Sequence, residues 1–293
     1  MPTQTISTWA TGCTSKVMQF FQVKKCNLST IGKILLIVVV SFAFQANAQS
    51  YEPVKSLPLS KARITTDYLG NLYTISAFRI TKYDLNGKRL YLFEDYKNGS
   101  IWNVDVTNPM KILVYYGDFM NVKVLDVTLS EMASYSLNDL GFYSVSAVAL
   151  ARDDHFWIFD YANFSLKKVN ENGEALYKSE KFNLLFKETV QAKQIIDYEN
   201  NVYLLDPVNG IYVFDRFATY KKRIPIIGIE KMQIIQDVIV YFQEGVLRSY
   251  NINDFIEEEM ALPEGVGASY SEIQKDRVYI LEEDKVSIYT FKQ

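Results

Sequence analysis

The sequence predicts an all-β protein, a six-bladed β-propeller of four-stranded antiparallel blades, and three observations carry this prediction. Runs rich in Val, Ile, Tyr and Phe alternate with Gly, Asn, Asp or Pro about every eight to twelve positions, as in consecutive antiparallel strands. An aromatic residue recurs about every 41 positions, which is the length of one propeller blade. A strand-like segment also precedes the first repeat, while the last repeat is one strand short.

The composition is that of a packed globular chain. Of 293 residues, 48% are apolar, 14% aromatic and 22% charged. These values exclude a disordered or collagen-like chain. The two cysteines, Cys13 and Cys26, both lie near the N-terminus, so a disulfide framework cannot stabilise the remaining residues.

Residues 1–48 have the features of a secretory signal peptide. Lys24, Lys25 and Lys33 precede an apolar run at 34–44, and Ala46-Asn47-Ala48 supplies a cleavage pattern before Gln49. A membrane anchor is the alternative, but this run reaches only about 17 Å across a hydrocarbon core of about 30 Å. Translation from Met18 would give a leader of more usual length. We therefore expect an exported protein of the periplasm, outer-membrane surface or extracellular space.

Removal of this leader makes the chain more acidic. It takes away four of the 31 basic residues and none of the 34 acidic ones, so the net charge changes from −3 to −7. Nucleic-acid binding depends on clustered Lys and Arg residues. We expect no nucleic-acid partner and no transmembrane helix in the mature chain, which we expect to be a monomer.

Six similar segments define the repeat. Each has an aromatic residue at one equivalent position, and the spacings between these positions are 42, 42, 46, 38 and 38: Tyr73, Tyr115, Trp157, Tyr203, Tyr241 and Tyr279. Six such units account for nearly all of residues 49–293. Seven blades would leave only about 35 residues per blade, fewer than the usual 40 to 45.

A carboxylate follows the aromatic residue by three positions in five of the six units. These are Asp118, Asp160, Asp206, Glu244 and Glu282, while the first unit has Ser76. We expect this position where the second strand of a blade turns into the third. There the carboxylates either accept hydrogen bonds from local backbone or form a ring that attracts a cation or a basic partner.

Two propeller families share parts of this repeat. Tyr203-Leu-Leu-Asp206, followed by the segment from Asn209 to Asp215, resembles the NHL repeat. The aromatic-x-x-Asp element is similar to that of YWTD propellers. Both families form six-bladed propellers, and in them this Asp tethers neighbouring backbone within the blade. The resemblance is loose, because the Asn-x-Arg of NHL repeats is absent and Tyr73-Thr-Ile-Ser76 lacks the acid.

The remaining elements follow from the strand pattern. The segment 52–59 is expected to supply the outer strand of the last blade, and 62–66 the inner strand of the first. One short helix or an ordered loop is expected within 181–194, where Phe182, Leu184 and Leu185 are apolar. Glu257-Glu258-Glu259 is expected to be a solvated loop. Asp153-Asp154-His155 is expected to form the turn between the first two strands of its blade.

Aromatic residues predicted in the loops of one face are the candidate binding residues. A cluster of exposed rings would bind a protein or a glycan, because rigid rings bury a large area at low entropic cost. The alternative role of each ring is packing between blades. The candidates are Phe78, Trp102, Phe119, Phe142, Tyr143, Tyr161 and Tyr270.

The chain lacks the patterns of common catalytic sites. His155 is its only histidine, and no Gly-x-Ser-x-Gly motif is present. We therefore expect a non-catalytic binding or scaffold module of the cell envelope, with no cofactor. Some six-bladed propellers hold a divalent ion in the central channel, and this likeness implies the alternative, a Ca²⁺-dependent hydrolase or lactonase. Its metal ligands would come from the inner strands: Asn103, Asp105, Asp197 and Gln233.

Overall fold

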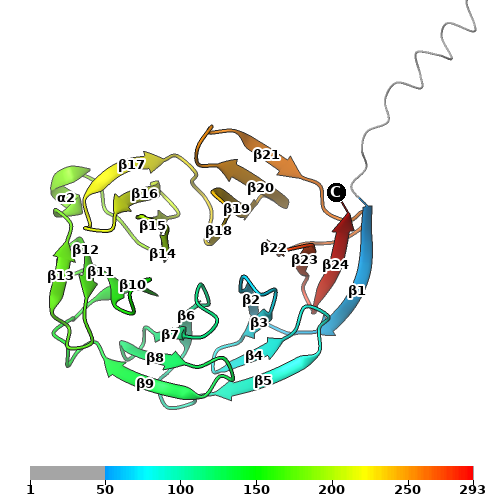
Figure 1. Cartoon of the computed structure of the whole chain (residues 1–293), viewed down its shortest axis with the longest axis horizontal. Helices are drawn as coiled ribbons and strands as arrows, with labels where there is room; N and C mark the ends of the chain where they lie inside the picture. The colour runs from blue at the N-terminus through cyan, green and yellow to red at the C-terminus, as the bar shows by residue number, and fades with distance from the viewer. Residues whose placement is uncertain (1–49, 293) are drawn as a thin grey trace, which may run out of the picture. The chain divides into compact units, whose positions relative to one another are not determined.

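Six four-stranded antiparallel sheets surround a central axis and form a β-propeller (Figure 1). The structure is a computed structural model that describes residues 50–292. These residues fall within one compact unit, Gln49–Gln293. The prediction of an all-β, six-bladed propeller is confirmed. The predicted signal peptide, residues 1–48, lies outside the described residues.

The first three blades follow one another along the chain. Each runs from an innermost to an outermost strand, in the order β2 to β5, β6 to β9 and β10 to β13. Their bounds are β2 Arg63–Thr66, β3 Leu72–Ile75, β4 Arg79–Tyr83, β5 Arg89–Glu94, β6 Ile101–Asp105, β7 Ile112–Tyr116, β8 Asn121–Leu125, β9 Glu131–Ser136, β10 Val145–Leu150, β11 Phe156–Asp160, β12 Ser165–Val169 and β13 Ala175–Lys178.

The last three blades have the same order, but the sixth takes its outer strand from the start of the chain. A short helix, α2 (Phe182–Leu185), lies between the third and fourth blades, within the segment predicted to hold one. The strands are β14 Gln194–Tyr198, β15 Asn201–Asp206, β16 Gly210–Asp215, β17 Tyr220–Ile224, β18 Met232–Ile235, β19 Val238–Gln243, β20 Val246–Asn251, β21 Glu257–Met260, β22 Tyr270–Gln274, β23 Arg277–Leu281, β24 Lys285–Lys292 and β1 Ser50–Pro58.

The recurring aromatic residue belongs to the second strand of every blade. Each of these six side chains is at most 2% exposed, because the second strand has a sheet neighbour on both sides and another blade against each face. The position therefore fills the space between blades, which explains why it recurs through otherwise different repeats. The residues are Tyr73, Tyr115, Trp157, Tyr203, Tyr241 and Tyr279.

The ring closes through strand β1, as the sequence predicts. β1 pairs antiparallel with β24, and Tyr51 lies opposite Phe291 and Leu57 opposite Val286. Leu57 packs with Val286, Ile288 and the first-blade residue Ile64 in one hydrophobic cluster. Figure 1 shows β1, in blue, beside β24, in red. The two ends of the propeller thus complete one sheet, and the last blade has no unpaired third strand.

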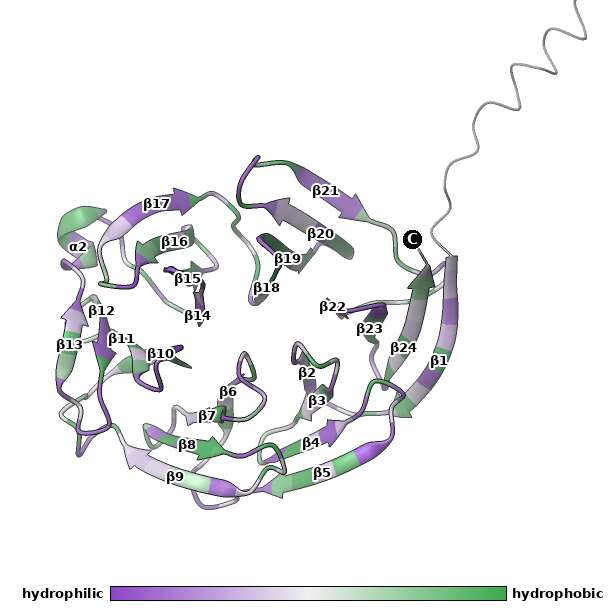
Figure 2. Ribbon diagram, in the orientation of Figure 1, coloured by the Kyte–Doolittle hydropathy of each residue, from purple (hydrophilic) through white to green (hydrophobic). Residues whose placement is uncertain are grey.

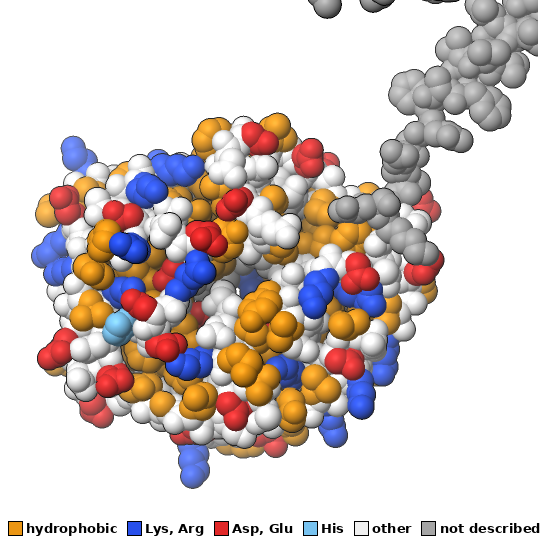
Figure 3. Space-filling view, viewed as in Figure 1, with side chains coloured by type: hydrophobic (Ala, Val, Ile, Leu, Met, Phe, Trp, Pro, Cys, Tyr) orange, Lys and Arg blue, Asp and Glu red, His pale blue; other side chains and the backbone are white. Residues whose placement is uncertain are grey.

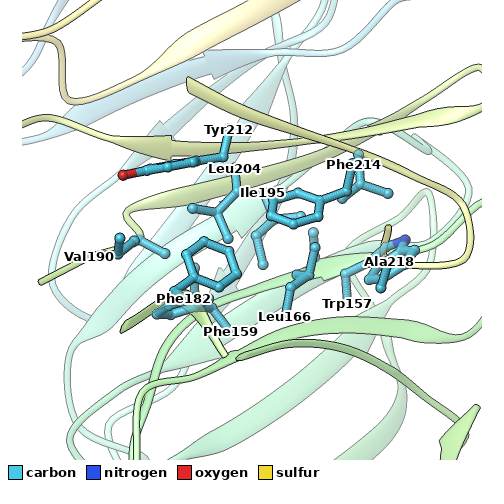
Figure 4. Close-up of a cluster of buried hydrophobic side chains, with 14 of the residues drawn as sticks. Trp157, Phe159, Leu166, Phe182, Val190, Ile195, Leu204, Tyr212, Phe214 and Ala218 are labelled. Atoms are coloured by element: carbon cyan, nitrogen blue, oxygen red, sulfur yellow. The ribbon is translucent and has the colours of Figure 1, made fainter. Parts of the chain in front are cut away.

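Hydrophobic clusters between adjacent blades hold the ring together. In the cluster between the third and fourth blades, Trp157 and Phe159 of β11 meet Tyr212 and Phe214 of β16 (Figure 4). Phe182 of α2 is fully buried among them. The outermost strands β17 and β21 are more polar, as their purple beside the green of β16 shows (Figure 2). Glu257, Glu258 and Glu259 belong to β21, so the prediction of a loop there is wrong: these glutamates occupy an exposed outer strand.

The strand order divides the loops between two faces of the ring. Turns between second and third strands, and connections between blades, lie on what we call the connection face. Turns between first and second strands, and between third and fourth strands, lie on the opposite face, called here the hairpin face. The turn Asp153-Asp154-His155 joins β10 to β11 as predicted and belongs to the hairpin face.

Candidate functional site

The repeated carboxylates lie on the connection face, each at the turn after a second strand. Asp160 accepts hydrogen bonds from the backbone N–H and side-chain amide of Asn163 at 3.1 and 2.8 Å, and pairs with Lys167 at 2.6 Å. Asp206 binds Asn209 in the same way, at 3.2 and 2.9 Å, and also accepts from the N–H groups of Gln191 and Val208. Both carboxylates therefore hold their own turns.

The other members of this set differ from one another. Asp118 accepts hydrogen bonds from Ser100 N–H at 2.8 Å and from the indole N–H of Trp102 at 3.1 Å. Glu282 accepts from the Ser287 hydroxyl at 2.7 Å. Glu244 occupies a left-handed turn position with φ 52°. The equivalent positions thus share a place in the blade but bind different partners.

The structure separates the predicted aromatic residues into two groups. Exposed fractions are 37% for Phe78, 49% for Trp102, 58% for Phe119 and 78% for Tyr143. The other three are more covered. Phe142, 4% exposed, belongs to a core cluster, Tyr161 packs against another, and Tyr270 packs beside Leu57 and Ile64. Trp102 and Tyr270 lie in the inner strands β6 and β22, so their prediction as loop residues is wrong.

A fifth exposed aromatic residue joins this group. Tyr96 is 66% exposed, and its ring centroid lies 5.5 Å from that of Phe78. It follows the outermost strand of the first blade, and no repeat position marks it, which is why the sequence comparison misses it. We call these five residues the aromatic row: Phe78, Tyr96, Trp102, Phe119 and Tyr143.

Hydrogen bonds join the segments that carry the aromatic row. The N–H of Asp95 donates to Phe78 C=O at 2.9 Å, so the first-blade turn meets the connection to the second blade. That connection meets the second-blade turn where Ser100 binds Asp118. The second-blade turn also meets the connection to the third blade, where Leu137 N–H donates to Met120 C=O at 2.8 Å. The row therefore stands on one continuous stretch of the connection face.

Contacts with neighbouring residues fix the orientation of the Trp102 side chain. One face of its indole lies against Gly117, where a Cβ atom would come within 2.0 Å of the ring. The indole N–H is bound to Asp118, and the ring of Tyr115 meets it edge-on, at 77° and a centroid distance of 6.2 Å. With one face and one edge occupied, the half of the ring that remains exposed is available to a partner.

Arg63 fixes the backbone of the strand that carries Trp102. It is the first residue of β2, and its guanidinium donates to the carbonyls of Ile101 and Trp102, each at 2.6 Å. Burial lowers the pKa of Arg63 from its ordinary value. The first blade thus holds the inner strand of the second through a charged group bound to two carbonyl oxygens.

A central cavity of about 530 Å³ lies inside the ring. Its wall comes from inner strands and from the turns that follow them, including Tyr68, Asn108, Arg152 and Glu199. These turns belong to the hairpin face, so the cavity opens there. Figure 3 shows the hollow, with hydrophobic side chains over β2 and charged side chains over β14 and β15.

A buried ion pair lies at the deep end of the cavity. Glu272, fully buried, pairs with Lys231 and accepts hydrogen bonds from Thr66 at 2.8 Å and Tyr270 at 3.1 Å. Lys231 also donates to Ile64 C=O at 2.8 Å. Burial lowers the pKa of Lys231, although Glu272 opposes this shift. Burial and the neighbouring Glu272 raise the pKa of Tyr270 well above its ordinary value.

The predicted metal ligands Asn103, Asp105, Asp197 and Gln233 all line this cavity. Gln233, however, donates to Thr66 at 2.9 Å and accepts from Ile273 N–H at 3.1 Å, which joins the fifth and sixth blades. Residues 50–292 contain no cluster of three or more His, Cys, Asp or Glu side chains arranged to hold a metal ion. The arrangement therefore offers a metal two carboxylates from different blades and an amide.

Asp105 and Asp197 already bind the protein itself. Asp105 accepts from Thr107 N–H and hydroxyl at 2.9 and 2.7 Å and from Leu150 N–H at 2.9 Å. Asp197 accepts from Trp157 Nε1 at 2.8 Å and Arg152 N–H at 3.2 Å. Burial raises the pKa of both carboxyls, and the charge of Asp197 adds to the rise at Asp105.

His155 lies apart from this cavity. Its Nδ1 is 3.2 Å from Asp153, whose other oxygen pairs with Lys168 at 2.6 Å. The cavity wall does not include His155. The one imidazole of the chain is therefore part of the turn that the sequence predicts.

Comparison with known proteins shows the fold. No known sequence family matches the chain, and no curated protein matches it. Similar solved structures include virginiamycin B lyase from Staphylococcus aureus, with 12% identity and a TM-score of 0.56 over 82% of this chain and 99% of the lyase. The Pan2 WD40 domain of Neurospora crassa has 8% identity and a TM-score of 0.56, covering 82% and 95%. BamB of Moraxella catarrhalis has 11% identity and a TM-score of 0.51, covering 83% and 98%.

These neighbours include an enzyme, and a histidine-to-alanine variant of that lyase is catalytically inactive. At such low identity the likeness extends to the propeller fold alone, because one fold supports many unrelated functions. Among the helices of the described segment, none is long and apolar enough to cross a membrane.

Proposed function

We propose that this chain is an exported, non-catalytic binding module of the cell envelope that docks a protein partner on its connection face. The observation that carries the proposal is the aromatic row, with Trp102 held by Gly117 and Asp118. Because the ring is fixed before binding, little side-chain entropy is lost when a partner covers it. The leader-like residues 1–48 support export.

The breadth of the row favours a polypeptide over a glycan. Its five aromatic side chains extend from the first blade to the connection that enters the third, which is wider than one sugar ring would cover. Phe78 and Phe119 have no polar atoms with which to bind hydroxyl groups. Trp and Tyr residues near the centre of an interface supply much of its binding energy. A glycan remains the other occupant that the experiment distinguishes.

The test replaces four of the five residues of the row and compares this row variant with a variant of exposed aromatic residues on the opposite face. The full chain, tagged at its C-terminus and produced in its own host, would be cross-linked in intact cells as wild type and as Phe78→Ala/Trp102→Ala/Phe119→Ala/Tyr143→Ala. The control, Phe217→Ala/Phe255→Ala, removes aromatics that are 46% and 61% exposed on the hairpin face. We expect cross-linking to one protein partner in wild type and control, and its loss in the row variant.

A second variant tests the position of Trp102 while keeping every aromatic residue. Gly117→Ala would place a methyl group 2.0 Å from the indole and so displace the ring. We expect weaker partner binding, by about tenfold, which corresponds to about 1.4 kcal/mol. Unchanged binding by Gly117→Ala and by the row variant would show that the partner docks elsewhere. Partner signal that survives protease but not glycosidase treatment would identify a glycan.

A Ca²⁺-dependent hydrolase or lactonase is the second candidate, because Asn103, Asp105 and Asp197 line one cavity. A bound Ca²⁺ would polarise an ester carbonyl there. Calcium titration of the purified chain tests it. Micromolar affinity that is lost in Asp105→Ala, together with Ca²⁺-dependent cleavage of a lactone, would rank this function first.

A further inference from the structure

The central cavity carries more negative charge than its cations neutralise. Its charged wall residues are Asp105, Arg152, Asp197, Glu199 and Lys231. Lys231 is bound to Glu272, and Arg152 lies 3.5 Å from Glu199 at the open end. The wall thus has two carboxylates, Asp105 and Asp197, with no cation of their own among the described residues.

The cations closest to these carboxylates already have partners. Lys168 and Arg152 act on Asp197 through their charges, but Lys168 Nζ is 2.6 Å from Asp153 and Arg152 lies 3.5 Å from Glu199. Asp105 and Asp197 instead accept neutral N–H and O–H donors. Asp105 is buried and Asp197 is partly buried, and burying a carboxylate without a cation is costly. A ligand that brings positive charge into the cavity would offset that cost.

A second observation points to a ligand independently of the charge. Thr65, on the inner strand β2, is 5% exposed and lines the cavity, and its hydroxyl has no hydrogen-bond partner within residues 50–292. The side-chain amide of Asn103 and the Oδ1 atom of Asp197, on the same wall, likewise have no partner in that range. Of the three residues, Thr65 is buried, where polar groups are normally hydrogen-bonded, whereas Asn103 and Asp197 are partly buried. Together they form a set of acceptors on the cavity wall that no other described residue uses.

This set suits an organic amine better than a metal ion. A calcium ion takes six to eight oxygen ligands, whereas no three acidic or metal-binding side chains of the described chain gather at one point. An ammonium group needs only three acceptors for its three N–H donors. A cavity of about 530 Å³ also lies within the usual range of small-molecule sites.

We propose that the central cavity binds a small aliphatic diamine or polyamine, which enters from the hairpin face. One ammonium group binds Asp197, and the charge of Asp105 balances the second. Thr65 and Asn103 accept the remaining N–H donors. The site lies at the other end of the ring from the aromatic row, so it does not depend on the function proposed above.

Calorimetry with the full chain tests the proposal at about 0.15 M salt, where surface charges are screened. Putrescine and spermidine are the probes, 1,4-butanediol is the neutral analogue of putrescine, and calcium chloride tests the metal. We expect saturable binding of both amines and none of the diol. Asp197→Asn should weaken amine binding by about tenfold or more, as expected when a charged hydrogen-bond acceptor is lost.

Thr65→Val separates a binding role from a folding role. It removes a hydroxyl that has no partner, so we expect an unchanged melting temperature and amine binding about threefold weaker. The matched control is Thr74→Val, on β3: Thr74 is also 5% exposed and its hydroxyl has no partner in the described chain, but it does not line the cavity. We expect this variant to bind amines as the wild type does.

Three results would overturn the proposal. The first is no amine binding at about 10 mM, a concentration at which even weak specific sites fill. The second is binding of 1,4-butanediol as tight as that of putrescine, which would identify a site for neutral polyols. The third is wild-type amine affinity in both folded variants, Asp197→Asn and Thr65→Val. Calcium binding without amine binding would identify a metal site instead.

Discussion

Single polar side chains join neighbouring blades by binding main-chain atoms. Gln194 of the fourth blade accepts from Met232 N–H at 2.9 Å and donates to Met232 C=O at 3.1 Å in the fifth. Gln233 continues this pattern to Ile273 of the sixth blade. Polar residues on inner strands therefore act as ties between sheets, and their presence near the channel does not by itself indicate a ligand.

Asp95 makes stability depend on pH. It is 6% exposed, and burial alone would raise its pKa. The side chain of Lys123, at 2.8 Å, the N–H of Lys97 and the amide of Asn98 together outweigh burial and lower the pKa from 3.8 to about 2. The folded state thus binds this proton more weakly than the unfolded state, and the stabilisation is complete at neutral pH.

We expect wild type to lose about 2 kcal/mol through this one group as pH falls from about 5 to about 2. Urea unfolding across this range measures the loss. The free energy of unfolding of Asp95→Asn should fall by correspondingly less over the same pH range, although this variant is less stable than wild type at pH 7. Lys123→Met, which removes the ion pair but keeps the carboxylate, should show a reduced loss. Parallel pH profiles for wild type and Asp95→Asn would contradict this assignment.

At the scale of one element, the helix α2 is anchored to the propeller by a single buried side chain. Phe182 is fully buried, and its ring meets those of Phe159, Phe186, Tyr212 and Phe214 at centroid distances of 5.0 to 5.5 Å. The helix has no side-chain N-cap, and one turn of helix is unstable alone. Packing of Phe182 between the third and fourth blades therefore holds it in place.

We expect Phe182→Ala to lower the free energy of unfolding by about 3 to 5 kcal/mol, because it leaves a cavity between two sheets. Leu184 of the same helix is 72% exposed, so Leu184→Ala should change stability by less than about 0.5 kcal/mol. Guanidinium unfolding of both variants makes the comparison. Equal effects at the two positions would show that the helix is not anchored by Phe182.

At this scale, the strands that carry a repeated residue pattern could be predicted from the sequence. The exposure of single side chains, which depends on contacts in three dimensions, could not. The spacing of Tyr73, Trp157 and Tyr279 identifies the second strands, because one packing environment recurs in each blade. The sequence does not reveal that Phe142 is buried while Tyr143 is 78% exposed. Nor does it show that Trp102 lies on Gly117, because that contact depends on how the strands pack in space.

The whole molecule is a ring closed by one pair of strands. Ser56 of β1 lies opposite Ser287 of β24, with 3.2 Å between their hydroxyl oxygens and 231 positions between them in sequence. Residues 50–292 contain no cysteine. A single engineered disulfide at this pair would therefore fix the closure covalently without competing thiols in the propeller.

We expect Ser56→Cys/Ser287→Cys to stabilise the oxidised protein by about 3 kcal/mol, since a long loop is closed. For a domain of this size that corresponds to a rise of about 6 to 12 °C in melting temperature. The background should carry Cys13→Ser and Cys26→Ser. Reduction of the same sample is the control, and it should return the melting temperature to that of the background. No difference between oxidised and reduced samples would show that opening of this strand pair does not limit stability.

The pairing of β1 with β24 also sets the order in which this protein can finish folding. Because the chain is synthesised from its N-terminus, β1 is made long before β24, the strand that pairs with it. Until the last residues appear, β1 has an unsatisfied backbone edge, and such edges template aggregation. During synthesis, the five blades from β2 to β21 can each be completed in turn, but the sixth must wait. A cell that makes this protein must therefore keep its first strand free until its last one arrives.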